Sequence, residues 1–200
     1  MEKKYKLTEE TINVEGTTLY RIEALRDFGD VKKGEKGGYV ENEDNLSHYD
    51  NCWVYENAIV SGNAKVYDNA KIYDNVMVCD DAIVCDNAEV SDYTWIYGNA
   101  TVCHNTKIYG NVKIYDKAVV YGNARISDNA KVCGNAQVYD YGEVCGNAMV
   151  YDNAKIFGYA IVGGDAKIFG YAKVYDEADV YGEADVCDNA EVCGDMEVYG

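Results

Sequence analysis

The sequence contains no proline and only two histidines among its 200 residues. Because proline removes a donor from a β-ladder, its absence suits a chain made almost wholly of paired strands. Two histidines leave little material for general acid–base catalysis. No C-x-x-C motif occurs, so the cysteine spacing gives no support for a zinc site. We therefore expect neither a metal nor a cofactor.

Long apolar runs and late basic residues are also missing. No stretch approaches the length of a membrane span, and residues 1–6 lack the apolar run of a signal peptide. After Lys173 there is no Lys or Arg, whereas acidic residues continue to Glu197, and the net charge is −17. This acidity opposes nucleic-acid binding. We expect a cytoplasmic protein without nucleic-acid or membrane partners.

What the sequence has instead is an unbroken six-residue repeat. Every sixth residue from Val54 to Val198 is Val or Ile, and we call this position i. Position i−2 is most often Ala, position i+2 is Asp or Gly except at Glu56 and His104, and position i+3 is most often Asn. A period of six does not keep Val on one helical face, which excludes a helix.

The repeat predicts one short strand and one bend per hexad. Side chains alternate along a strand, so positions i−2 and i point inward while i−1 and i+1 point outward. Asp, Gly and Asn tolerate the positive φ that a corner requires. Three hexads close a triangular coil of 18 residues, and Val40 and Leu46 fit two earlier hexads, before an eight-residue step to Val54. The sequence therefore predicts an all-β parallel solenoid of about nine stacked coils.

Residues 18 apart form regular columns, which supports three sides per coil. One column is Ala throughout from Ala64 to Ala190, as a narrow interior corner would demand. Asn69, Asn87, Asn105 and Asn123 are placed for an amide ladder. A corner column alternates Gly and Asp from Gly62 to Asp188, which we interpret as keeping like charges apart.

The N-terminal region departs from the repeat. Residues 11–14 and 18–22 alternate around Glu15-Gly16, which predicts a β-hairpin. Solenoid ends expose strand edges and need caps. We therefore assign residues 1–38 to an N-terminal cap and residues 39–200 to the repeat solenoid.

The hexads resemble the left-handed β-helix of hexapeptide-repeat proteins, since Val or Ile at i follows Ala at i−2. Tyr, Cys or Ser at i+1 departs from that motif, which prefers Gly, Ala or an acid. Residues 25–34, 37–41, 45–47 and 51–55 look like the N-terminal segment of the YdcK-like hexapeptide-repeat family of bacteria and their phages. The resemblance implies a left-handed parallel β-helix with a small cap. It implies a fold more than a reaction.

The cysteine pattern argues against a disulfide framework. All cysteines except Cys52 occupy position i+1, which Tyr or Ser fills in most other hexads, so they look like interchangeable surface residues. In a reducing cytoplasm we expect all to be free thiols. Cys85 and Cys103 should lie one above the other on adjacent coils.

Outward apolar residues are the candidate interface. One column holds Ile59, Met77 and Trp95, beside Tyr97 and Tyr115, and a second holds Tyr121, Tyr139, Phe157 and Tyr175. Contiguous apolar patches mark binding or self-association faces, although Tyr also simply suits exposed strands. The first column predicts a lateral homo-oligomer, and the resemblance favours a trimer.

Three functions remain open from the sequence. A non-catalytic scaffold is favoured by the unbroken repeat. A small-ligand-binding protein would need sites between subunits. A hexapeptide-repeat acyltransferase would need a catalytic histidine and a protruding loop, and the hexads show no such insertion. The candidate histidines are His104, expected at an exposed corner, and His48, expected to pack in the cap or on the surface.

Overall fold

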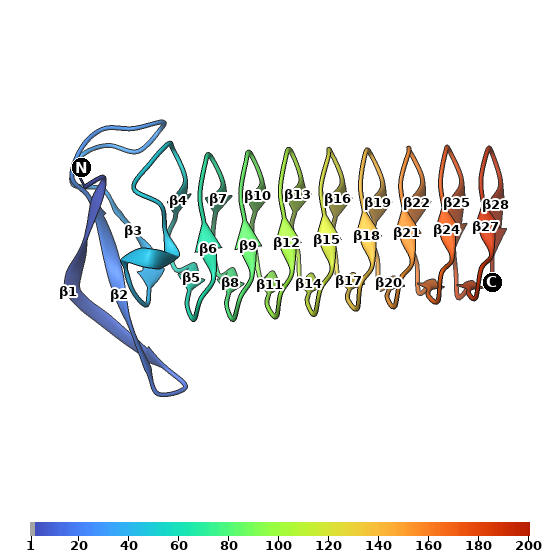
Figure 1. Cartoon of the computed structure of the whole chain (residues 1–200), viewed down its shortest axis with the longest axis horizontal. Helices are drawn as coiled ribbons and strands as arrows, with labels where there is room; N and C mark the ends of the chain where they lie inside the picture. Colours follow the sequence, from blue (N-terminus) through green and yellow to red (C-terminus); the bar gives the residue numbers. More distant parts are fainter. Residues whose placement is uncertain (1–2) are drawn as a thin grey trace.

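The computed structural model describes residues 3–200. It is all-β, with one short 3₁₀ turn, η1 (Glu43–Asn45), among the described residues. The chain winds into a straight rod of stacked coils with the cap at one end (Figure 1). The predicted β-solenoid of about nine coils, 18 residues apart, is confirmed. The left hand of the coil stays an expectation from the resemblance.

Three sheets form the sides of the rod. Face A is the solenoid part of an 11-stranded sheet, face B is an 8-stranded sheet and face C is a 9-stranded sheet. Face A comprises β3 (Lys36–Val40), β5 (Ile59–Val60), β8 (Met77–Val78), β11 (Trp95–Ile96), β14 (Lys113–Ile114), β17 (Lys131–Val132), β20 (Met149–Val150), β23 (Lys167–Ile168) and β26 (Asp185–Val186). Face B comprises β6 (Lys65–Val66), β9 (Ile83–Val84), β12 (Thr101–Val102), β15 (Val119–Val120), β18 (Gln137–Val138), β21 (Lys155–Ile156), β24 (Lys173–Val174) and β27 (Glu191–Val192). Face C comprises β4 (Trp53–Val54), β7 (Lys71–Ile72), β10 (Glu89–Val90), β13 (Lys107–Ile108), β16 (Arg125–Ile126), β19 (Glu143–Val144), β22 (Ile161–Val162), β25 (Asp179–Tyr181) and β28 (Glu197–Tyr199).

The interior is a stack of aliphatic layers. Strands pair in parallel with partners 18 residues away, as in Val102 opposite Val84 and Val120. Position i is fully buried through most of the rod, and so is the Ala column from Ala64 to Ala172. Val40 and Leu46, the two earlier hexads, are also fully buried. This dry core supplies the main driving force for folding.

The corners depend on left-handed residues at i+2. Asp116 has φ of 59° and Gly98 has φ of 69°. A carboxylate oxygen of Asp116 accepts a hydrogen bond from the backbone N–H of Gly134, one coil further on, at 3.1 Å. A Cβ on Gly98 would lie 2.9 Å from the backbone nitrogen of Asp116. Gly–Asp alternation thus gives corner N–H groups a carboxylate partner and leaves room for close stacking, in addition to separating charges.

The cap is the predicted hairpin, extended at its outer ends. The strands β1 (Tyr5–Val14) and β2 (Thr17–Ala24) flank Glu15 and Gly16, both at positive φ. β2 pairs antiparallel with β3, and β3 pairs in parallel with β5, so the hairpin continues face A. The boundary predicted between residues 38 and 39 falls inside β3, and residues 1–2 of the assigned cap lie outside the described residues.

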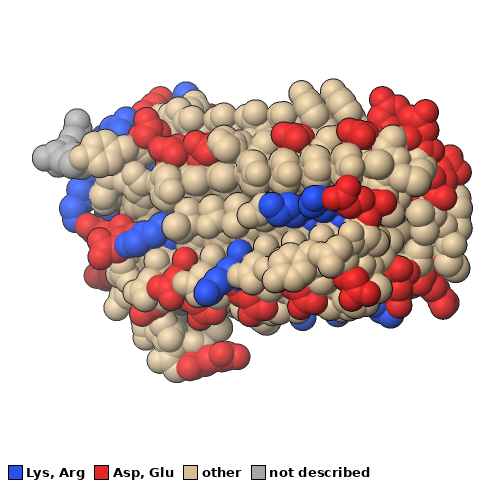
Figure 2. All heavy atoms as spheres, turned by 45° about the vertical axis from the view of Figure 1, so that its right-hand side comes forward, with Lys and Arg blue, Asp and Glu red and all other residues tan. Residues whose placement is uncertain are grey.

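Charge is distributed unevenly along the rod. Acidic side chains gather at the C-terminal end, on the right of Figure 2, where Lys and Arg are missing from the sequence after Lys173. Among residues 3–200 no helix has the length and apolar character needed to cross a bilayer.

Candidate functional site

A groove lies where the hairpin meets face A. The hairpin projects sideways beyond the coils (Figure 1), and the space between its tip and the solenoid measures about 490 Å³. Met77 and Trp95 from face A and Leu19 from β2 contribute apolar surface, and Glu15, Glu41 and Asp80 contribute acidic groups. We call this space the hairpin groove. It combines an apolar centre with charge, as a protein-binding surface does.

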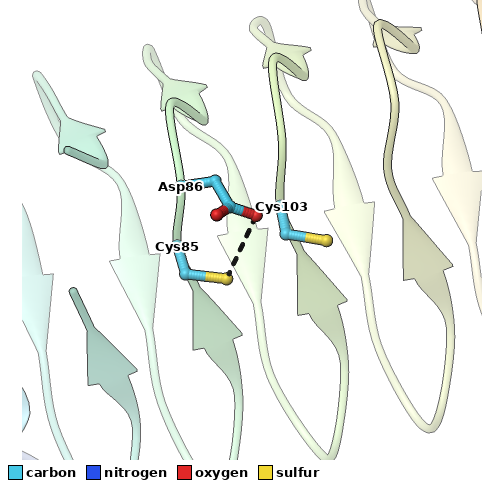
Figure 3. Close-up of side chains that lie close together, drawn as sticks. All are labelled: Cys85, Asp86 and Cys103. Atoms are coloured by element: carbon cyan, nitrogen blue, oxygen red, sulfur yellow. Dashed lines mark hydrogen bonds between the residues drawn. The ribbon is translucent and has the colours of Figure 1, made fainter. Parts of the chain in front are cut away.

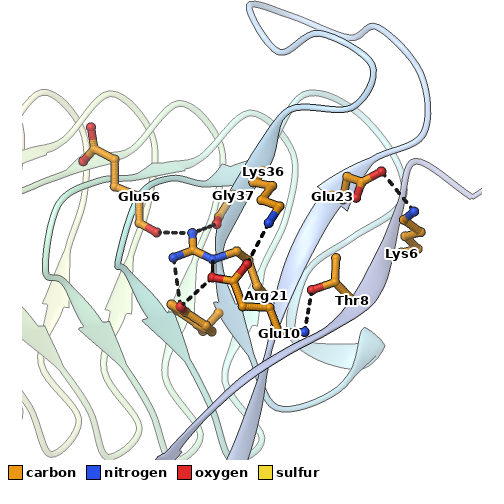
Figure 4. Close-up of polar contacts among 9 residues, drawn as sticks. Lys6, Thr8, Glu10, Arg21, Glu23, Lys36, Gly37 and Glu56 are labelled. Carbon is orange, nitrogen blue, oxygen red and sulfur yellow. Dashed lines mark hydrogen bonds and ion pairs between the residues drawn. The ribbon is translucent and has the colours of Figure 1, made fainter.

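Arg21 fixes the hairpin against the first coils (Figure 4). Its guanidinium donates to the carbonyl oxygens of Gly37 at 2.7 Å and Glu56 at 3.0 Å, and to the hydroxyl of Tyr39 at 2.8 Å. Its Nε donates to Glu10 at 2.7 Å. The Arg21 side chain is only 16% exposed. The hydrogen bonds of this largely shielded guanidinium therefore hold the hairpin, which forms one wall of the groove, against the first coils.

Two residues of the first predicted column, Met77 and Trp95, line this groove, whereas Ile59 does not. Ile59, Met77 and Trp95 lie on β5, β8 and β11, which pair consecutively. Ile59 and Met77 are half-buried, whereas Trp95 is 44% exposed. The rings of Tyr97 and Tyr115 stack beside this column with centroids 5.0 Å apart. Trp95 is the largest apolar side chain offered to solvent here.

The second predicted column is a continuous stack on face B, away from the groove. The rings of Tyr121, Tyr139, Phe157 and Tyr175 are parallel, with neighbouring centroids 4.9 Å apart. Each ring is half-buried, because its neighbours cover its two faces. Such stacking stabilises the exposed side of the sheet. The two columns therefore do not form one site.

A further aromatic pair was missed from the sequence. Tyr141 and Tyr159 occupy position i+3, where Asn is usual, and stack at 4.9 Å while remaining 53% and 61% exposed. With Lys107 and Arg125 they line a second groove, of about 480 Å³, at the corner between faces B and C. The signal was the replacement of the corner Asn by Tyr.

The two candidate histidines lie in different surroundings. His104 is at a corner with φ of 61° and a side chain 57% exposed, as expected. Its Nδ1 accepts a hydrogen bond from the backbone N–H of Gly122 at 3.3 Å, and its Nε2 lies 3.9 Å from an oxygen of Asp86. That separation is too long for the hydrogen bond that would orient a general base.

His48 packs in the cap, as expected. Its ring stacks on Tyr5 with centroids 4.3 Å apart, and its Nδ1 accepts from the backbone N–H of Lys4 at 3.2 Å. Burial lowers the pKa of His48 below its ordinary value, although the nearby Glu43 carboxylate opposes this shift. These contacts give His48 a structural position beneath the cap.

The thiols are less exposed than the sequence suggested. All eight cysteines are unpaired in the structure. Cys85 is only 7% exposed, so the view of interchangeable surface residues is wrong for it; stacked neighbours cover the i+1 position. Burial, with Asp80 and Glu15 nearby, raises the pKa of Cys79 in the hairpin groove to about 11. That thiol is protonated near neutral pH and makes a poor nucleophile.

The fold places the chain in the class of β-solenoid repeat proteins. No protein-family model matches the sequence, and no curated protein matches it. The argument about function therefore rests on the geometry of this chain.

Proposed function

We propose that the protein is a non-catalytic interaction scaffold that associates laterally with further copies of itself through the hairpin groove. The observation that carries this proposal is Trp95, which is 44% exposed in the groove between the anchored hairpin and face A. An exposed Trp beside Met77 forms the kind of anchor that dominates binding energy in protein interfaces. We propose a trimer, on the resemblance to hexapeptide-repeat proteins.

The charges of face A support a second copy as the occupant. Beyond Trp95, the outward strand position of face A holds Lys113, Lys131 and Lys167, with Asp185 alone of opposite sign. The hairpin groove is rimmed by Glu15, Glu41 and Asp80. Face A thus carries an acidic groove and basic strands, the two charges that a contact between copies needs. End-to-end association would instead bring the acidic C-terminal coils toward a second molecule.

No comparable observation supports the alternative that the protein is an acyltransferase. An acyltransferase needs an oriented base, and His104 has no such hydrogen bond while His48 is packed under the cap. From Val54 to Val198 the repeat continues without an inserted loop. The proposal places the protein in the cytoplasm, where its thiols stay reduced.

Trp95→Lys tests the proposal, because it places a charge in the apolar centre of the groove. We expect light scattering to show a shift toward the monomer for this variant. Tyr171→Lys is the matched control, since Tyr171 is 64% exposed and does not line the groove, and it should keep the wild-type mass. Equal masses for Trp95→Lys and wild type would contradict the use of this groove.

A further inference from the structure

Two thiols and a carboxylate converge on face B, away from the hairpin groove. Cys85 follows β9 and Cys103 follows β12, and these strands pair in parallel. The donor atoms of Cys85, Asp86 and Cys103 all lie within 4.8 Å of one another (Figure 3). The Cys85 sulfur is 4.0 Å from an oxygen of Asp86. Three groups that bind metals therefore share one small volume.

The cluster coincides with a combination of residues that occurs once in the repeat. In an outward column that is otherwise aromatic from Tyr67 to Tyr175, Cys85 and Cys103 occupy consecutive coils, and no other two repeat cysteines do so. The corner residue after Cys103 is His104, the only histidine in the hexads from Val54 onward. Neither the core nor the corner requires these substitutions, since Tyr, Ser, Asp and Gly serve the same positions elsewhere.

His104 adds a fourth donor beside the cluster. Its Nδ1 lies 3.9 Å from the Cys103 sulfur, and its Nε2 lies 3.9 Å from an oxygen of Asp86. Its backbone N–H also donates to that Asp86 oxygen, at 3.0 Å. Zinc bond lengths imply donor–donor distances of roughly 3.3–3.8 Å in a tetrahedral site. Cys85, Asp86 and Cys103 already lie within 4.8 Å of one another and would have to draw together, and the His104 ring would have to turn so that one of its nitrogens faces the other three donors.

We propose that Cys85, Asp86, Cys103 and His104 bind one zinc ion in the reduced protein. Thiolate, imidazole and carboxylate are the ligands that zinc accepts, and soft sulfur donors select it over magnesium or calcium. The C-x-x-C spacing rule missed this site, because the two cysteines are 18 residues apart in sequence and adjacent only through coil stacking. This proposed zinc site replaces the expectation, made from the sequence, that the protein binds no metal.

The surroundings suit uptake of a divalent cation. Zinc binding to thiols releases their protons, so the site should fill more readily as pH rises. His104 is 57% exposed, which leaves a path from solvent to the cluster.

Cobalt serves as the spectroscopic probe of this site. Metal-free, reduced, full-length protein is titrated with Co²⁺ alone. We expect a sulfur-to-cobalt charge-transfer band that saturates at one equivalent per chain and disappears when Zn²⁺ is added. Cys85→Ser and Cys103→Ser should each lose most of the band. Serine already occupies this repeat position at Ser61, Ser91 and Ser127, so the fold tolerates the change.

Cys145→Ser is the matched control, because Cys145 occupies the same repeat position with Ser127 and Gly163 above and below it. It should bind cobalt like wild type. His104→Asn keeps a residue that tolerates φ of 61° and should weaken binding about tenfold or more. Zn²⁺ should raise the melting temperature of wild type and Cys145→Ser but not of Cys103→Ser.

Two results would overturn the zinc site. One is the absence of a charge-transfer band in reduced wild type, or an undiminished band in both Cys85→Ser and Cys103→Ser. The other is a native Cys85–Cys103 disulfide, found by alkylation and mass spectrometry, in protein that binds no cobalt after reduction. Neither result bears on self-association, which is measured separately.

Discussion

At the scale of single residues, the Asp side chains at the corners have the same structural roles in one coil after another. Asp at i+2 adopts a left-handed conformation and also accepts a hydrogen bond from the next corner, as Asp80 does from the N–H of Gly98 at 3.0 Å. Asp and Asn tolerate this conformation because their short polar side chains bond locally. The corner composition therefore follows from two requirements at once.

Asp116→Ala removes both features at once, the tolerance of a left-handed conformation and the acceptor oxygen. Alanine at φ of 59° is strained and offers no acceptor to Gly134, so we expect a loss of about 1–3 kcal/mol in the free energy of unfolding. Asp116→Asn, which keeps both the conformation and an acceptor oxygen, should lose much less. Urea denaturation followed by circular dichroism measures both. Equal losses for the two variants would contradict a role for the left-handed conformation and the acceptor oxygen.

His48 predicts a pH dependence of stability. Its pKa is lowered in the folded protein from 6.5, chiefly by burial, so the unfolded chain binds the proton at higher pH. The contribution of His48 is therefore complete above pH 6.5 and is lost as pH falls through the folded pKa. His48→Asn retains an acceptor for the Lys4 N–H but cannot titrate. The urea midpoint of wild type should fall more steeply below pH 6.5 than that of the variant; parallel curves would refute this.

At the scale of elements, each strand of the rod is too short to be stable alone. Most strands contribute two residues, one outward and one inward, and stability comes from stacking on neighbouring coils. The hairpin is longer; Tyr5, Ile22 and Ala24 at its base pack into the core, and Arg21 adds hydrogen bonds to the first coils. Core substitutions should therefore disturb several coils together.

Val120→Asp tests the inward position, because it buries an unpaired charge between Val102 and Val138. We expect the central coils to fail to fold, with loss of β-sheet circular dichroism and of protection from hydrogen exchange. Val119→Asp is the control on the same strand, since Val119 faces outward and is partly exposed. An unchanged melting temperature for Val120→Asp would show that i is not the interior position.

The repeat could be predicted from the sequence because a period of six matches one strand and one corner. Columns of residues 18 apart then indicated three sides per coil. The amide ladder expected from Asn69 to Asn123 is present, with side-chain hydrogen bonds of 3.2–3.3 Å. The contacts inside the cap could not be predicted from the sequence. Lys4 is fully buried and donates to the carbonyl oxygen of Cys52 at 2.8 Å, a tertiary contact that no periodicity encodes.

The candidate sites could be predicted only in part from the sequence. The Ile59, Met77 and Trp95 column was visible as outward apolar residues, whereas the hairpin groove depends on where the cap docks. Likewise, the adjacency of Cys85 and Cys103 followed from the 18-residue coil, but the approach of Asp86 and His104 depends on corner geometry. Sequence periodicity gives columns, and side-chain conformation decides which neighbours converge.

At the scale of the whole molecule, the rod offers different surfaces for different contacts. Its interior is filled with buried aliphatic side chains. Its C-terminal end is acidic (Figure 2), which opposes end-to-end contact. Face A, with the hairpin groove and Trp95, remains the surface best suited to lateral association.

The most direct test of this account is the solution mass of the wild-type protein over a range of concentrations, measured by light scattering under reducing conditions. Lateral association through face A predicts a mass that is a multiple of 22.2 kDa, and the proposed trimer predicts three times that value. The larger species should gain population as concentration rises. A mass of 22.2 kDa that persists at the highest concentration would contradict self-association through the hairpin groove.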